Sequence, residues 1–362
     1  MKELPGNDPG KFSIADLKSI VFGRLGAEAK GMLVPPAIGH DFNVQQLGDA
    51  KVLLVSTDPL YVNPVFGIEA GTWLGFQIIL SDILLSGQLP QQAIFTLNLP
   101  NAMDIDVFEQ IWSVIDNECK RLGISIISGH TGRYDGCNYP ILGGGTMLTT
   151  CGEKEFIDPS SIQQDDDIIL AGNPASEALA SLLAVDTRGG EETFGNAYPG
   201  MRDDAWADLS IECVTALVMD AFRKTGENPF TEIHAMHDVA EKGVLGAASE
   251  LCEACDFGCR LDLDSFPIDP NVEAFLELHF PDPTSIWSAS GQGGLLVACN
   301  PARTEIIINA LADEDVPAAR IGKFNDYGQH RVYTILKENH SLKAPIEDPF
   351  WPAFHKALHD YQ

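Results

Sequence analysis

Basic residues are scarce in this chain of 362 residues: 23 Lys and Arg accompany 52 Asp and Glu, and the formal net charge is -29 at pH 7. The sequence has no cluster of Lys or Arg, although proteins that bind DNA or RNA depend on such clusters. An acidic surface also repels anionic membranes. We therefore expect neither a nucleic acid nor a membrane as a partner. An anionic ligand would need metal ions, backbone amides or helix N-termini at its site.

The sequence also lacks a long apolar run and a secretory leader. No uninterrupted apolar stretch reaches the roughly 18 residues that a membrane-spanning helix needs. The first residues are polar and include Pro5, Gly6, Pro9 and Gly10, unlike a secretory leader. Eight cysteines in a chain of this length do not indicate a disulfide framework. These absences predict a cytoplasmic protein with reduced thiols.

Hydrophobic residues make up 45% of the chain, and its length suits two domains with separate cores. Helix and strand patterns alternate in both halves, which predicts an α/β (α+β) fold. We expect an N-terminal sheet domain over residues 1–155, a C-terminal α/β domain over 156–345 and a tail over 346–362. The polar, glycine-rich stretch 186–203 predicts a long loop. Strands are expected at 51–57, 92–99, 124–128, 139–150, 167–171, 234–238, 259–263, 293–299, 320–324 and 331–336, and helices at 11–26, 71–86, 106–122, 174–185, 206–224, 243–255 and 301–312.

Four aspartates occupy positions where a carboxylate is expected to bind a cation. Asp58 follows a continuous apolar strand, and Asp82 is the single charge in a long apolar helix. Asp41 follows a Pro-Pro turn, and Asp238 lies between an apolar run and a glycine-started helix. A buried carboxylate costs several kcal/mol unless it is paired or bound to a cation. Because magnesium prefers oxygen ligands, the four positions predict a magnesium site.

Structural roles for two of these aspartates remain open on the sequence alone. Asp82 is also suited to cap a helix or to pair with Arg24 or Lys51, and Asp58 with Pro59 is also typical of a simple turn.

Other patterns are less specific. Cys252, Cys255 and Cys259 have metal-ligand spacing, but they lie on an apolar helical stripe and its continuation, which favours structural cysteines. The glycine run 143–145 lacks the lysine of a phosphate-binding loop, which favours a bulge or close strand packing.

Two interpretations are open for a pair of histidines, and two for one polar segment. His234 and His237 are suited to general acid-base chemistry or to satisfied polar contacts near Asp238. The stretch 186–203, with Arg188 and Arg202, is either a binding site for a second substrate or an inert insertion.

The order of several short motifs resembles one enzyme family. This PurM-like family comprises aminoimidazole ribonucleotide synthetase, selenophosphate synthetase, thiamine-monophosphate kinase and the carbamoyl dehydratase of hydrogenase maturation. Within it, the synthetase-related and HypE-like members are the most similar. The motifs are Gly39-His40-Asp41, Ser56-Thr57-Asp58, Ser81-Asp82 followed by Gly87-Gln88-Leu89-Pro90, Ser128-Gly129-His130-Thr131, His237-Asp238-Val239 followed by Gly243-Val244-Leu245-Gly246, and the Ser/Gly-rich run 288–299.

The resemblance implies a two-domain fold whose N-terminal sheet domains form a homodimer, with ATP near that interface. It implies that Mg2+ is held by Asp41, Asp58, Asp82 and Asp238, of which the first three also bind the nucleotide. Gly129, His130 and Thr131 would line the phosphate end, with His130 and Asp238 as the catalytic residues. In this chemistry a substrate oxygen attacks the γ-phosphate, while the protein positions groups and neutralises charge.

Three departures from the family pattern qualify the expected activity. Phe42 and Asn43 replace small residues and are expected to narrow the nucleotide pocket. No cysteine precedes Cys119, which argues against selenophosphate synthesis, and the final residues lack the cysteine of the carbamoyl dehydratase tail. We expect an ATP-dependent enzyme that phosphorylates or activates an oxygen of a small substrate. The alternatives are a HypE-like maturation protein that acts on a partner protein, and a non-catalytic nucleotide-binding dimer.

Overall fold

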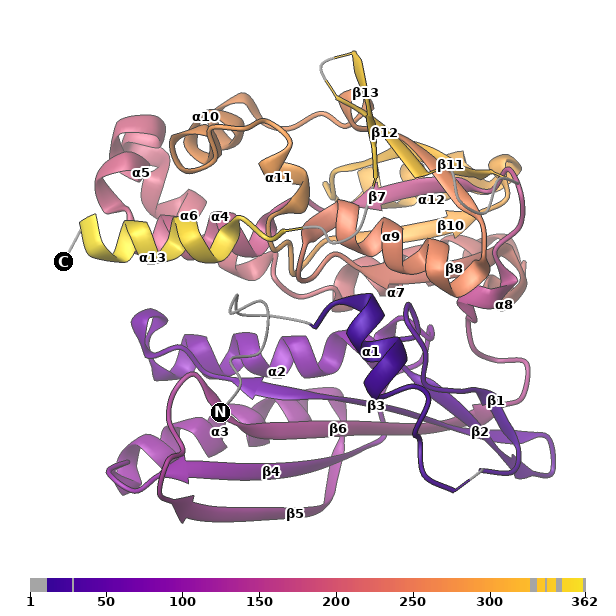
Figure 1. The fold of residues 1–362 in the computed structure, drawn as a ribbon, viewed down its shortest axis with the longest axis horizontal. Coiled ribbons are helices and arrows are strands. Elements are labelled where there is room, and N and C mark those ends of the chain that lie inside the picture. Colours follow the sequence, from indigo (N-terminus) through magenta and orange to yellow (C-terminus); the bar gives the residue numbers. More distant parts are fainter. Residues whose placement is uncertain (1–11, 28, 326–330, 336, 343–346, 361–362) are drawn as a thin grey trace.

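The chain folds around two β-sheets, one in each half of the sequence (Figure 1). The computed structural model describes residues 12–27, 29–325, 331–335, 337–342 and 347–360. We call residues 12–152 the N-terminal half and the described residues from 167 onward the C-terminal half. Both sheets and their helices confirm the expected mixed α/β class. Within the described residues, no helix combines the length and the apolar character needed to cross a membrane.

The N-terminal half contains a six-stranded sheet in the order β1-β2-β3-β6-β4-β5. Two helices, α2 and α3, cover one of its faces, and α2 lies between this sheet and the C-terminal half (Figure 1). The elements are α1 (Ile14–Ile20), β1 (Met32–Val34), β2 (Asn43–Gly48), β3 (Lys51–Tyr61), α2 (Ile68–Leu84), β4 (Gln92–Pro100), α3 (Ile105–Leu122), β5 (Ser125–Tyr134) and β6 (Ile141–Gly152).

Two strands of this half are longer than their sequence patterns predict. β3 continues through Asp58 and Pro59, so these residues do not form a turn. Proline is tolerated there because β2 pairs with β3 only as far as Val55, so that none of the described strands pairs with Pro59 on that side. β5 likewise continues through the Gly129-His130-Thr131 motif.

The glycine run 143–145 serves close strand packing, as its sequence suggested. A Cβ atom on Gly143, whose φ is +135°, would lie 1.8 Å from the carbonyl oxygen of Thr96. A Cβ atom on Gly145 would lie 2.9 Å from the side chains of Ile79 and Phe95.

The C-terminal half contains a seven-stranded sheet in the order β13-β12-β9-β11-β7-β10-β8. Both faces of this sheet are covered. In β7, Ile168 and Leu170 join one hydrophobic core with α4 and α9, whereas Ile169 and Ala171 join the other with α7 and α12. The elements are β7 (Asp167–Ala171), α4 (Ser176–Val185), α5 (Thr187–Phe194), α6 (Tyr198–Ala207), α7 (Glu212–Thr225), α8 (Pro229–Glu232), β8 (Ile233–Asp238), α9 (Gly243–Cys255), β9 (Gly258–Asp262), α10 (Pro270–His279), α11 (Ser285–Ser288), β10 (Leu295–Cys299), α12 (Thr304–Ala312), β11 (Ala318–Asn325), β12 (Arg331–Ile335), β13 (Glu338–Ser341) and α13 (Phe350–Asp360).

The expected long loop at 186–203 is wrong, because this stretch forms α5 and most of α6. The carboxylate of Asp186 accepts a hydrogen bond from the backbone N–H of Gly189 at 2.8 Å and so caps α5. Tyr198 is buried and donates its hydroxyl hydrogen to the carbonyl of Leu183 at 2.6 Å. Tertiary packing of this kind overrides the low helix propensity of a glycine-rich stretch.

The expected single helix at 206–224 is also divided, since α6 ends at Ala207 and α7 begins at Glu212. α1 is shorter than the expected 11–26, and none of its side chains is buried.

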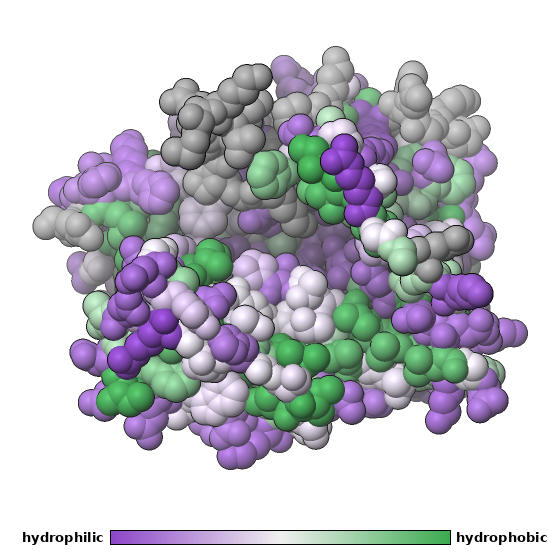
Figure 2. Space-filling view, turned by 60° about the horizontal axis from the view of Figure 1, so that its bottom comes forward, coloured by the Kyte–Doolittle hydropathy of each residue, from purple (hydrophilic) through white to green (hydrophobic). Residues whose placement is uncertain are grey.

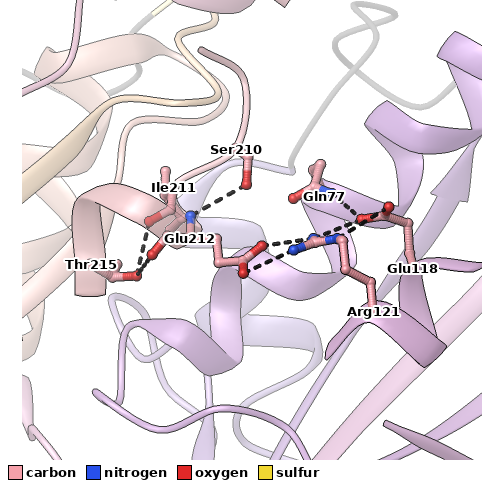
Figure 3. Close-up of polar contacts among 7 residues, drawn as sticks. All are labelled: Gln77, Glu118, Arg121, Ser210, Ile211, Glu212 and Thr215. Carbon is pink, nitrogen blue, oxygen red and sulfur yellow. Dashed lines mark hydrogen bonds and ion pairs between the residues drawn. The ribbon is translucent and has the colours of Figure 1, made fainter. Parts of the chain in front are cut away.

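Arg121 of α3 joins the two halves on one side of the molecule (Figure 3). Its guanidinium donates to both carboxylate oxygens of Glu212 at 3.0 and 2.7 Å, and also to Glu118 of α3. The side chains of Arg121 and Glu212 keep 47% and 28% of their surfaces exposed. The attraction between such exposed charges is largely screened by water.

We therefore expect Arg121→Ala to lower the free energy of unfolding by no more than about 1 kcal/mol. Urea unfolding monitored by tryptophan fluorescence measures this change, with Arg188→Ala, which removes an exposed ion pair within α5, as the control. A loss several times larger would mean that the ion pair is a principal contribution to the stability of the contact between the halves.

Candidate functional site: an acidic cluster between the halves

Asp58 and Asp82 are brought together by the packing of α2 on β3. Asp58 lies on the same face of β3 as the buried Val52 and Leu54, because side chains alternate along a strand. α2 covers this face closely: a Cβ atom on Gly75 would lie 2.2 Å from the carbonyl oxygen of Tyr61. Asp82 thus reaches Asp58 and shares a hydrogen bond with it.

Asp41 is held where the N-terminal half contacts α9. Gly39, with φ +77°, packs against the backbone of α9, and a Cβ atom there would lie 2.3 Å from the carbonyl oxygen of Glu250. On the other side of Asp41, Phe42 is buried in the hydrophobic core of the first sheet. The phenylalanine therefore anchors this loop, and the expectation that it narrows a ligand pocket is wrong.

Asp238 comes from the C-terminal half, at the end of β8. Its Oδ2 accepts a hydrogen bond from the hydroxyl of Ser81, the neighbour of Asp82, at 3.2 Å. His237 lies beside it, with Nε2 3.5 Å from Asp41 Oδ2 and 3.5 Å from Glu250 Oε2. Both halves of the chain therefore contribute side chains to one acidic cluster.

The negative charges of the aspartates in this cluster repel one another. Burial raises the pKa of Asp82 well above its ordinary value, and the negative charges of Asp58, Asp41 and Asp238 raise it further. The charged groups that act on Asp82 are thus acidic, and pairing with Arg24 or Lys51 is not observed. Burial alone would lower the pKa of His237, but the nearby carboxylates raise it to about 10. While no cation is bound, the carboxylates thus favour the protonated ring of His237.

This donor set fits a divalent cation. Asp41, Asp238 and, in its neutral form, His237 each offer a ligand atom, and these three atoms lie within 4.8 Å of one another. Asp58 and Asp82 add carboxylate oxygens that interact with the same group. Oxygen-rich sites of this kind suit Mg2+, and a bound cation would relieve the repulsion that raises the pKa of Asp82.

The Gly129-His130-Thr131 motif lies apart from the cluster within one chain. The cross-strand register runs from Asp58 to Gly145, then to Phe95 and then to Gly129. Three strand spacings correspond to roughly 14 Å. His130 is exposed on the edge strand β5 and hydrogen-bonds with the hydroxyl of Tyr134. At this separation the side chains of the motif do not contact the cluster within one chain.

The other candidate groups have structural contacts. His234 bonds through Nδ1 to Asp166 Oδ2 at 2.6 Å, a satisfied buried contact. Cys252 and Cys259 are buried in the hydrophobic core that includes α4 and α9, and Cys255 packs against that core, as expected for structural cysteines.

Sequence reasoning did not include Glu250 in the site, and it assigned His237 no definite partner. One signal was present, because Glu250 is the first charge after seven uncharged residues in the helix that begins at Gly243.

The chain is similar to known proteins over most of its length. The models "AIR synthase related protein, N-terminal domain" and "AIR synthase related protein, C-terminal domain" match residues 39–149 and 167–335. Selenide, water dikinase of Pseudomonas straminea is 24% identical over 338 residues, covering 83% of this chain and 85% of that protein. A putative hydrogenase expression/formation protein of Methanocaldococcus jannaschii is 23% identical over 310 residues and covers 84% of each chain.

The fold agrees with these matches. The solved structure of the hydrogenase maturation protein HypE in complex with ATP superimposes with a TM-score of 0.63 at 19% identity, covering 93% of each chain. The two-sheet architecture is thus that of a known fold class. The chain belongs to the AIR synthase related protein family, which confirms the resemblance inferred from its motifs.

Proposed function

We propose that this protein is a magnesium-dependent, ATP-binding enzyme that phosphorylates or activates an oxygen of a small substrate. The observation that carries the proposal is the convergence of Asp41, Asp58, Asp82 and Asp238 from both halves. A chain with a net charge of -29 repels a nucleotide unless cations screen the phosphates. The cluster is the place where such a cation would be held.

In this proposal the four aspartates hold Mg2+, which would neutralise charge on the phosphates during transfer. The side chain of Ser81 orients Asp238 through its hydrogen bond. Gly129, His130 and Thr131 of a second chain would line the phosphate end. His130 and Asp238 are proposed as the catalytic residues, which position the reacting groups.

Equilibrium binding of ATP at low and high magnesium concentration tests the proposal. Binding that strengthens with magnesium, together with release of ADP when a substrate is present, is the expected result. Thermal-shift measurement of a metabolite collection in the presence of ATP identifies that substrate, because a ligand of the folded state raises its stability. Binding of ATP that is unaffected by magnesium would contradict the proposal, and binding without any ADP release would favour a non-catalytic nucleotide-binding dimer.

A second candidate function is supported by the similarity to the hydrogenase expression/formation protein. In that case the acceptor would be a partner protein. Stable co-purification of one protein from the native host, in the presence of ATP, would favour this alternative over a small-molecule acceptor.

We further propose that the protein is a homodimer through its first sheet. The face that α2 and α3 leave uncovered carries the exposed side chains Leu33, Leu47, Ile127 and Ile141. Figure 2 shows apolar side chains spread over this side of the molecule.

Ile127→Asp is expected to weaken dimerisation about 100-fold, because it would bury an unpaired charge at the interface. Light scattering coupled to size exclusion, over a range of protein concentrations, measures this. Leu278→Asp is the matched control, since Leu278 is 58% exposed, comparable with the 50% of Ile127, and lies on α10 in the other half. A wild-type protein that is monomeric at micromolar concentration would contradict the proposal.

A further inference from the structure

The carboxylate of Asp348, just before α13, holds the turn that follows Asp238. Its Oδ2 accepts the backbone N–H of Lys242 at 3.0 Å and the hydroxyl of Ser290 at 3.2 Å. Its Oδ1 accepts the backbone N–H groups of Ser290 at 3.3 Å and of Phe350 at 2.9 Å. One side chain thus connects three segments that are far apart in the sequence.

The turn from residue 239 to 242 links Asp238 directly to α9. Val239 donates its N–H to the carbonyl of Gly294 at 2.9 Å, and Gly291 donates to the carbonyl of Ala240 at 3.2 Å. Lys242 has a left-handed conformation with φ +66°, which a non-glycine residue adopts at a cost. The hydrogen bond from Lys242 to Asp348 compensates for that conformation.

α13 extends this connection to the N-terminal half. Phe350 and Phe354 are buried on the inner side of the helix. The ring of Trp351 contacts Tyr61 edge to face at 6.0 Å, and the ring of Phe354 lies 5.6 Å from that of Phe66. Tyr61 belongs to β3, the strand that carries Asp58. In Figure 1, α13 lies on the side of the C-terminal half that faces α2.

We propose that Asp348 is a positioning residue: through the turn at 239–242 and through α13, it fixes Asp238 against Asp41, Asp58 and Asp82. This proposal rests on the proposed function for the role of the cluster. The reason is geometric, since one half supplies Asp238 and the other supplies the remaining carboxylates. A cation bound by both halves requires that they keep a fixed relative position.

The substitution Asp348→Asn is a sensitive test of this positioning role, because each oxygen of Asp348 accepts two hydrogen bonds. Asparagine keeps one accepting oxygen and directs an NH2 group at two donors, so half of the contacts are lost at almost unchanged volume. Ser290→Ala is a milder second variant that removes the hydroxyl contact with Asp348, together with the contact of the same hydroxyl with Glu177. Glu347→Gln is the matched control, since Glu347 is adjacent and exposed and its substitution removes the same charge.

Two measurements test the proposal. For Asp348→Asn, the magnesium concentration that gives half-maximal ATP binding should rise about 10-fold, as for residues that orient metal ligands. Amide hydrogen exchange should become faster at 239–242 and also at 39–41 in the other half. Ser290→Ala should shift both measurements in the same direction by a smaller factor, and Glu347→Gln should change neither.

An unchanged magnesium dependence in Asp348→Asn would overturn the proposal, as would faster exchange confined to the residues around position 348. Failure of the proposed function is distinguishable, because the wild-type protein would then bind ATP without magnesium dependence. In that event, hydrogen exchange at 39–41 still decides whether Asp348 fixes the relative position of the two halves.

Discussion

Replacing Asp82 by asparagine is expected to weaken magnesium-dependent ATP binding by at least about 10-fold, since even residues that only orient a metal ligand cost this much. The same variant should melt at a higher temperature than the wild type when magnesium is absent. The pKa of Asp82 is raised by desolvation and by the neighbouring charges of Asp58, Asp41 and Asp238. Its ionised form therefore destabilises the metal-free fold at neutral pH, and an amide removes this repulsion.

The opposite directions of the two effects make this experiment decisive. Excess magnesium should recover part of the lost ATP affinity, because a site with one charge fewer binds the cation more weakly but in the same place. Asp313→Asn, at an exposed position of the C-terminal half, controls for the charge change. A higher melting temperature with equal ATP affinity at every magnesium concentration would assign Asp82 a purely structural role.

The second large effect concerns Glu177, in the first turn of α4. This side chain is only 9% exposed. Burial, followed by the charges of Asp348 and Glu241, raises its pKa from 4.5 to about 8, and a hydrogen bond with Ser290 opposes the shift. In the unfolded chain the group loses its proton near its ordinary pKa. The wild-type protein should therefore lose stability progressively as the pH rises from about 4.5 to about 8.

Glu177→Gln should remove this loss, since glutamine resembles the protonated carboxyl group and does not titrate. The free energy of unfolding of the variant should exceed that of the wild type by up to about 5 kcal/mol above pH 8, because one pKa unit corresponds to about 1.4 kcal/mol. The difference should shrink towards pH 4.5. Denaturant unfolding across this pH range measures it, with the exposed Glu191→Gln as control. A difference that does not vary with pH would contradict the prediction.

Within the site, the sequence alone identified residues that are unusual among their neighbours in the sequence. Asp82 stood out because a single charge in an apolar helix is costly wherever that helix packs. The motif order across residues 39–246 identified the family. Its aspartates do converge in the structure. Short apolar runs also predicted most strands of both sheets, because such runs are a property of neighbouring residues.

Other features depend on contacts between distant segments, and only the tertiary structure decided them. Helices α5 and α6 form in a glycine-rich stretch because Asp186 caps one and Tyr198 packs against α4. β3 continues past Asp58 because β6 still pairs with it there. No local pattern relates Asp348 to Lys242, which lies 106 positions earlier. Hydrophobicity and spacing determine which segments become helices or strands, whereas packing determines which of their side chains meet.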